Sequence, residues 1–101
     1  NLSGVENQIE GSVVDGLSTL ANQRITIREG RIQETNFDTY PLLRMPKAPR
    51  VHVQMIASGY APTGAGEPAL PPLAPAVGNA VFAACGERIR ELPISKAGFR
   101  V

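Results

Sequence analysis

The chain has 101 residues, of which 43% are hydrophobic and 19% are charged, and its formal net charge is +1. This composition is typical of a globular protein and argues against a disordered chain, and the near-neutral charge gives no support for a nucleic-acid partner. No apolar run approaches the roughly 20 residues that a membrane-spanning helix needs.

The length predicts one small domain, residues 1–101, with a modest core. The start, Asn1-Leu2-Ser3-Gly4, is neither an initiating Met nor a signal peptide, so we expect a piece of a longer protein. The single cysteine, Cys85, and the single histidine, His52, exclude an internal disulfide and a Cys/His zinc site. We therefore expect no metal ligands in this chain.

Residues 3–23 are predicted to form a helix, because small or apolar residues recur at 3.6-residue spacing. The stripe comprises Val5, Ile9, Val13, Gly16, Leu17 and Leu20. Ser3 and Glu6 have the spacing of a capping box at its start. Residues 24–28 and 31–35 then alternate polar and apolar residues around Glu29-Gly30, which predicts a β-hairpin. The same alternation predicts that Ile25, Ile27 and Ile32 point into the core.

Residues 36–50 are predicted to be an irregular loop, since prolines interrupt them while apolar residues between the prolines pin the loop to the fold. Residues 50–56 alternate again and predict a third strand. Residues 72–90 predict a second, slim helix rich in Ala and Gly, with cations in its last turn and Pro93 as its stop. Residues 94–101 are predicted to be a tail that Phe99 docks.

This order predicts an α+β fold in two layers, with an antiparallel sheet of about three strands packed against two helices.

A Gly- and Pro-rich loop, residues 62–72, presents one carboxylate, Glu67. Gly64 and Gly66 allow backbone and ligand to approach closely, and Pro68 stiffens the backbone directly after the acid on a loop that leads to a helix start. A glutamate carboxylate is ionised at neutral pH and can accept a proton. The alternative interpretation of Glu67 is an ordinary solvated surface acid.

Two stretches occur together in one chain: residues 7–18 in the first helix, which include Gln8-Ile9-Glu10-Gly11, and residues 64–84, which include Gly66-Glu67-Pro68. With residues 25–32, 36–45 and 88–94, the ordered set resembles the C-terminal end of the molybdenum-binding large subunit of the xanthine dehydrogenase and aldehyde oxidase family. The resemblance is strongest to the isoquinoline 1-oxidoreductase beta subunit. It covers nearly the whole chain.

The resemblance implies that Glu67 is the general base in a hydroxylation of an aldehyde or N-heteroaromatic carbon. It implies that Gln8, with Gly66 beside the acid, contacts the pterin of the cofactor. A neutral amide can both donate to and accept from a pterin edge. Asn7 departs from the glycine that often precedes this glutamine in the family, and a locally hydrogen-bonded surface amide is the alternative for Gln8.

For the full subunit the resemblance implies a molybdenum cofactor, a molybdopterin in the cytosine dinucleotide form. Its implied partners are the remainder of the large subunit, a [2Fe-2S] small subunit and a cytochrome c as one candidate electron acceptor. The chain alone is expected to be inactive, because the rest of the site lies elsewhere. A second hypothesis is a free-standing module that binds a protein partner through a sheet edge or its slim helix. Substrate and compartment, bacterial periplasm or cytoplasm, stay open.

Overall fold

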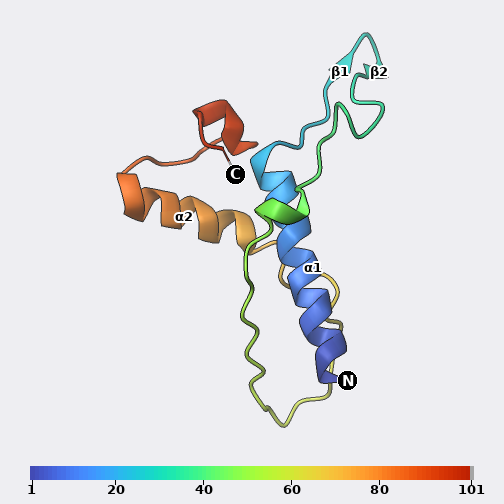
Figure 1. The fold of residues 1–101 in the computed structure, drawn as a ribbon, viewed down its shortest axis with the longest axis vertical. Helices are drawn as coiled ribbons and strands as arrows, with labels where there is room; N and C mark the ends of the chain where they lie inside the picture. Colours follow the sequence, from blue (N-terminus) through green and yellow to red (C-terminus); the bar gives the residue numbers. More distant parts are fainter. Residues whose placement is uncertain (101) are drawn as a thin grey trace.

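A computed structural model describes residues 1–100 as two helices, a small hairpin and long irregular connections (Figure 1). The helices are α1 (Leu2–Ala21) and α2 (Leu73–Cys85), and the strands are β1 (Ile27–Arg28) and β2 (Arg31–Ile32). Two short 3₁₀ helices, η1 (Met45–Lys47) and η2 (Ile94–Ala97), complete the order. The fold is therefore α+β, as predicted.

Helix α1 begins at Leu2, because the Asn1 side chain caps it by accepting a hydrogen bond from the Gly4 amide over 3.4 Å. The expected capping box of Ser3 and Glu6 is wrong, since the Ser3 hydroxyl instead donates to the Asn1 side chain. The buried positions of α1 are Ser12, Gly16, Ser18, Leu20 and Ala21. Three of them are small residues that the apolar stripe did not include.

Helix α2 is shorter than the predicted 72–90. It ends where Gly86 adopts the left-handed conformation, with φ 77°, and its amide donates to the Phe82 carbonyl over 2.8 Å. Residues 87–90 therefore lie outside the helix, and the predicted cations in the last turn and the stop at Pro93 are wrong. Arg88 turns back, and its guanidinium lies 3.6 Å from the centre of the Phe82 ring.

The hairpin forms around the predicted turn, with Ile27 opposite Ile32 and Arg28 opposite Arg31, but each strand has two residues instead of the predicted five. The Gln33 amide extends the pairing to the Thr26 carbonyl over 2.9 Å. Among residues 1–100 the sheet has these two strands, so the expected third strand at 50–56 is not formed. The segment is extended but has no strand partner within residues 1–100.

The hairpin contacts neither helix in the part of the chain that the structure describes, so the predicted second layer is absent there. Figure 1 shows it standing away from both helices. Ile25, Ile27 and Ile32 are 52%, 71% and 56% exposed, and the prediction that they point into a core is wrong. A hairpin buries such residues only when something covers its face.

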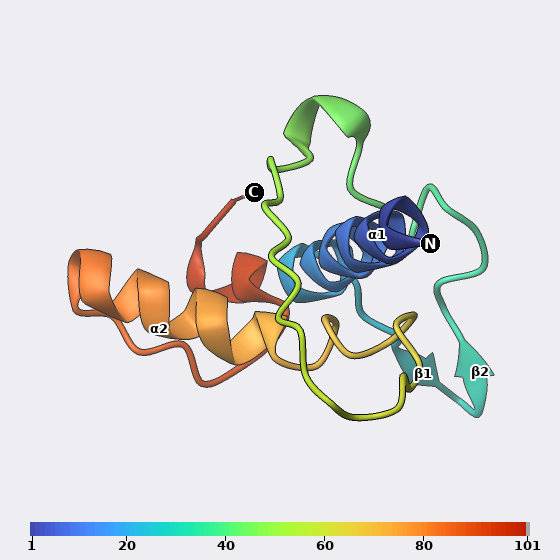
Figure 2. The same ribbon diagram turned by 90° about the horizontal axis from the view of Figure 1, so that it is seen from below.

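The small core lies where α2 and η2 contact the C-terminal half of α1 (Figure 2). The buried hydrophobic residues among residues 1–100 are Leu20, Ala21 and Ile94. Ile94 thus docks the end of the chain, whereas Phe99, the predicted anchor, is only partly buried. Residue 101 of that predicted tail lies outside the described residues.

The molecule is more open than a compact monomer of its mass. Its accessible surface is 7928 Å² for 10.7 kDa, whereas a compact protein of that mass exposes about 5,500 Å². Its Cα radius of gyration is 16.0 Å, against about 13 Å for a compact domain of 100 residues. Much of the surface that a compact fold would bury is therefore exposed.

Candidate functional site

The site is built where the loop carrying Glu67 runs back along α1. The Ser12 hydroxyl, which is buried in α1, donates a hydrogen bond of 2.5 Å to the carbonyl of Gly66. Ser12 lies one turn beyond Gln8 on the same face of the helix. This bond therefore fixes the backbone directly before Glu67 against the helix that carries Gln8.

Gln8 and Gly66 lie close together in space. A Cβ atom placed on Gly66 would lie 3.6 Å from the side-chain oxygen of Gln8, which is ordinary van der Waals contact. At Gly64 an added Cβ would meet nothing within 4 Å. The structure therefore brings together two of the predicted site positions, Gln8 and Gly66, with Glu67 next in the chain.

One turn of α1 beyond Ser12, at Gly16, the helix and the chain that follows the Glu67 loop come closer still. A Cβ atom added to Gly16 would lie 2.7 Å from a methyl carbon of Leu73 and 3.6 Å from the Leu70 carbonyl. Gly16 thus allows the first residue of α2 to pack directly on α1. Ser12 and Gly16 therefore hold the two ends of the Glu67 loop. Sequence reasoning did not identify them as site residues. Small residues four positions apart lie on the same face of a helix, and this spacing is a signal of close approach.

Glu67 itself is exposed and begins a turn, in which its carbonyl accepts from the Leu70 amide over 3.0 Å. A second turn joins Leu70 to Leu73, and α2 starts only there. The acid therefore precedes the helix by two turns of chain and does not sit at its N-terminus. The loop surrounds a hollow of about 510 Å³ lined by Thr63, Gly64, Gly66, Glu67 and Pro68.

The side-chain amide of Gln8 is exposed, and it makes no hydrogen bond to any group within residues 1–100. The alternative interpretation, that Gln8 is a surface amide with a local hydrogen bond, is therefore not supported, because no such bond forms in the part of the chain that the structure describes. Both its donors and its acceptor are available to a ligand beside the Glu67 loop.

Metal-ligating groups are not gathered at this site. Within residues 1–100, no group of three or more His, Cys, Asp or Glu side chains could hold a metal ion. The donor set at the loop, an amide and a carboxylate next to backbone groups, suits an organic ligand edge and a proton transfer.

The same residues include no helix long and apolar enough to cross a membrane.

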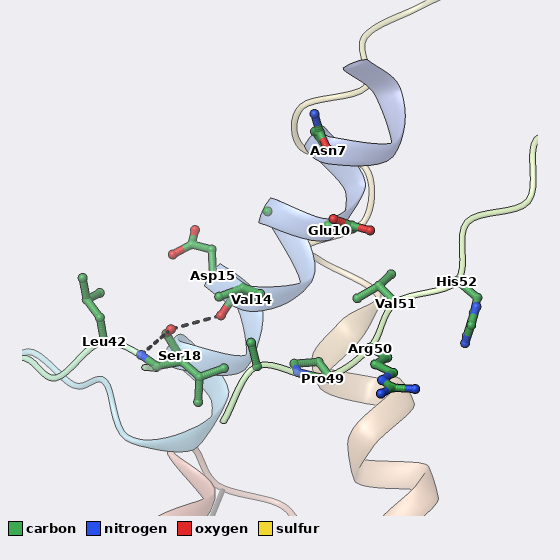
Figure 3. Close-up of a pocket in the computed structure, with 13 residues that line it drawn as sticks. Asn7, Glu10, Val14, Asp15, Ser18, Leu42, Pro49, Arg50, Val51 and His52 are labelled. Carbon is green, nitrogen blue, oxygen red and sulfur yellow. Dashed lines mark hydrogen bonds between the residues drawn. The ribbon is translucent and has the colours of Figure 1, made fainter. Parts of the chain in front are cut away.

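A second and larger cleft, of about 730 Å³, lies on another face of α1, between that helix and residues 42–52 (Figure 3). The Ser18 hydroxyl closes one end of it by accepting from the Leu43 amide over 2.9 Å and donating to the Val14 carbonyl over 3.0 Å. Glu10 and Asp15 line the helix side, and Arg50 and His52 come from the opposite segment. Neither Gln8 nor Glu67 lines this cleft.

Those bonds attach residues 36–50 to α1, but the predicted apolar anchoring is wrong in part, since Leu42 and Met45 are 42% and 90% exposed, and the otherwise irregular loop contains η1. The Gln23 side chain adds a further anchor by donating to the Pro41 carbonyl over 3.4 Å. Ser18 and Gln23 are both buried polar residues of the helix end, and each is satisfied by this loop.

Comparison with known proteins identifies three relatives along nearly the whole chain. The beta subunit of isoquinoline 1-oxidoreductase from Brevundimonas diminuta is 36% identical over 93 residues, which is 92% of this chain and 12% of the relative. A subunit of nicotinate dehydrogenase from Pseudomonas putida is 36% identical over 96 residues, 94% of this chain and 8% of the relative. Over nearly its whole length the chain is therefore similar to one segment of these subunits.

A third relative is the membrane-bound aldehyde dehydrogenase [pyrroloquinoline-quinone] of Gluconacetobacter polyoxogenes, which is 35% identical over 94 residues, or 93% of this chain and 12% of the relative. No family model matches the chain. The chain spans only about a tenth of the length of these curated relatives, 8–12%. It therefore corresponds to one segment of a much larger subunit.

Proposed function

We propose that this chain is a segment, C-terminal as the sequence resemblance implies, of the large subunit of a molybdenum hydroxylase. In this proposal Glu67 is the catalytic base, and Gln8 and Gly66 form part of the cofactor wall. The observation that carries it is the convergence of Gln8 and Gly66 at the Glu67 loop, 3.6 Å from side-chain oxygen to the added Cβ position. The relatives support the oxidoreductase class through their names.

The residues at the loop fit the organic part of such a cofactor. An unpaired amide at Gln8 offers donors and an acceptor to a pterin edge, and glycines at 64 and 66 leave space for a flat group to approach the backbone. When bound, the molybdenum group would supply the oxidation of a substrate carbon with oxygen that derives from water. This chain would contribute hydrogen bonds and a proton acceptor, and the metal would be held outside it.

The role of Glu67 in this proposal is to accept a proton at its carboxylate. The residue is exposed to the hollow of the loop, and the Ser12 bond to Gly66 restricts the backbone that carries it. A fixed base of this kind contributes about 10²–10⁴-fold to a rate. The chain alone is inactive in the proposal, because the remaining parts of the site lie in the rest of the subunit.

The finer parts of the proposal concern the whole enzyme. We propose the cytosine dinucleotide form of the cofactor, a small [2Fe-2S] subunit and a cytochrome c acceptor. Two of the relatives are named as subunits, which supports an enzyme of several chains. The name of the third relative contains pyrroloquinoline-quinone, so a quinone is the alternative redox group that the cofactor analysis must distinguish.

The test uses the full-length subunit in its native complex. Glu67→Gln is expected to keep the molybdenum and pterin content while turnover falls by about 10²–10⁴-fold. Glu87→Gln, at an exposed glutamate after the end of α2, is the matched control and is expected to keep full turnover. Retained turnover in Glu67→Gln would remove the residue from the mechanism. A bound quinone without molybdenum would reject the proposed cofactor.

The free-standing interaction module remains the competing hypothesis, and the native gene product distinguishes the two. A product of about this chain's length, purified without a larger subunit around it, would favour the module. A polypeptide of the relatives' size would favour the oxidoreductase segment.

A further inference from the structure

Residues 51–54 have the alternating side-chain burial of a β-strand. Val51 and Val53 are partly buried, whereas His52 and Gln54 are exposed, so burial alternates with a period of two. Figure 3 shows Val51 turned toward α1 and His52 turned away from it. The extended segment runs past the N-terminal half of α1 in Figure 1. Val51 therefore faces α1 across the cleft that lies between them.

The backbone of the same segment has no partners in the part of the chain that the structure describes. No N–H or C=O group of residues 50–62 makes a hydrogen bond to another of residues 1–100. Backbone groups that are buried in a folded protein are almost always paired, so this segment can be buried in a larger protein only if its N–H and C=O groups find partners. An extended segment with alternating side-chain burial and two open backbone edges has the features of a strand without its sheet.

The sequence of the segment also lacks the devices that keep a free edge from pairing. Natural sheets protect an exposed edge with lysines, prolines or bulges. The segment begins with Arg50, and after it residues 51–56 contain no Lys, Arg, Asp, Glu or Pro. Met55 and Ile56 are instead 53% and 84% exposed, as expected for side chains that a neighbouring strand or its sheet covers.

We infer that residues 50–56 are a strand of a sheet whose neighbouring strand comes from the rest of the same subunit polypeptide, outside residues 1–101. The inference rests on the proposed function in one respect, that the chain is a segment of a large subunit. The relatives support this source of the partner, because about nine-tenths of their length lies outside the matched segment. The accessible surface of 7928 Å² leaves ample area for that contact.

The pairing has a specific signature. Along a strand, the N–H groups of alternate residues point to the same edge. A neighbour on one edge protects the amides of one alternating set, either 51, 53 and 55 or 52, 54 and 56. A neighbour on each edge protects both sets.

Hydrogen exchange at single-residue resolution on the full-length native subunit tests the strand, with a synthetic peptide of residues 48–58 as the unpaired reference. We expect at least one alternating set of amides to exchange about 100-fold or more slowly than in the peptide. Exchange of all six amides within about tenfold of the peptide would overturn the inference. No substitution is needed, so a failure to fold cannot mimic either result.

A photo-crosslinking residue identifies the neighbour. Placed at Gln54, which is exposed, it is expected to form a crosslink within the same polypeptide. A crosslink to another subunit or to a second copy of this chain would overturn the assignment of the partner. The same residue at Gln33, in the hairpin, serves as the control for non-specific labelling.

The outcome is separable from that of the proposed function. Protected amides in a protein that lacks molybdenum would support the strand and reject the cofactor. Unprotected amides in a protein that contains molybdenum and loses turnover in Glu67→Gln would reject the strand alone.

Discussion

The Ser12 hydroxyl donates a 2.5 Å hydrogen bond to the carbonyl of Gly66, and so joins the middle of α1 to the residue before Glu67. Ser12 is only 6% exposed, so water does not readily replace this contact. Among residues 1–100 this is the one side-chain hydrogen bond between α1 and the Glu67 loop. Its removal is therefore expected to act on the position of the acid without touching the acid itself.

Ser12→Ala is expected to release the Glu67 loop, because it removes a hydrogen bond that contributes about 1 kcal/mol. Turnover of the full enzyme should fall by up to about fivefold, the factor that corresponds to 1 kcal/mol. Proteolytic cleavage within residues 58–66 should become faster by a similar factor. Ser3→Ala, at an exposed serine of the first turn, is the control, and equal behaviour of both variants would show that the bond does not hold the loop.

Gly16→Ala tests the close packing of α2 on α1. The new methyl group would lie 2.7 Å from a methyl carbon of Leu73, and the cost of moving that side chain should exceed the gain in helix propensity. We expect the free energy of unfolding to fall by about 1 kcal/mol, measured by urea denaturation of the full subunit.

Gly11→Ala is the matched control on the same helix, since a Cβ there would meet nothing within 4 Å. It is expected to stabilise α1 by up to about 1 kcal/mol. A gain in stability in both variants would contradict the close approach at Gly16.

The hairpin should respond to acid through Glu34. Hydrogen bonds from the Thr26 hydroxyl and the Thr26 amide, the latter 2.6 Å long, hold the pKa of Glu34 below its ordinary value of 4.5. Because the pKa is lower in the folded chain than in the unfolded one, the stabilisation is complete above about pH 4.5 and is lost as the pH falls through the folded value.

Exchange of the Thr26 amide, corrected for the intrinsic pH dependence, is expected to become faster as the pH falls below this range. Glu34→Gln should remove this additional acid dependence and leave a weaker hairpin at neutral pH. An unchanged profile in the variant would show that another group is responsible.

Glu29→Asn should strengthen the hairpin turn. Glu29 has φ 51° and Gly30 has φ 74°, the positive values that a two-residue turn of type I′ requires. Asn tolerates this conformation better than Glu does, so we expect a gain of a few tenths to about 1 kcal/mol. The measurement is slower exchange of the Gln33 amide, which pairs with Thr26, and Glu29→Val should show the opposite change.

The features that sequence reasoning predicted are those that depend on local chemistry. Both helices lie within or next to their predicted ranges, because spacing and helix propensity act within a few residues. The hairpin turn at Glu29-Gly30 follows from the residues of the turn alone. The pinned loop after it was predicted from its prolines and apolar residues, although its anchors, Ser18 and Gln23, were not.

The features that were missed depend on partners far away in the chain or outside it. The alternation of Ile25, Ile27 and Ile32 predicts a covered face, and no described residue covers it. The end of α2 was misplaced because the left-handed conformation of Gly86 outweighed the continuing pattern of residues 87–90. At the site, Gln8 and Glu67 came from a family resemblance, and geometry brings Gln8 and Gly66 together without testing their roles.

Gln8, Ser12 and Gly16 lie four residues apart on one face of α1. Their spacing along the helix therefore determines where the loop that carries Glu67 lies. A residue gained or lost between positions 8 and 16 would swing the glutamine about 100° away from the loop. Insertions before Thr63, by contrast, would leave both anchoring points of the loop unchanged. In variants of this protein, length changes should therefore accumulate in residues 57–62 and be absent from the middle of the first helix.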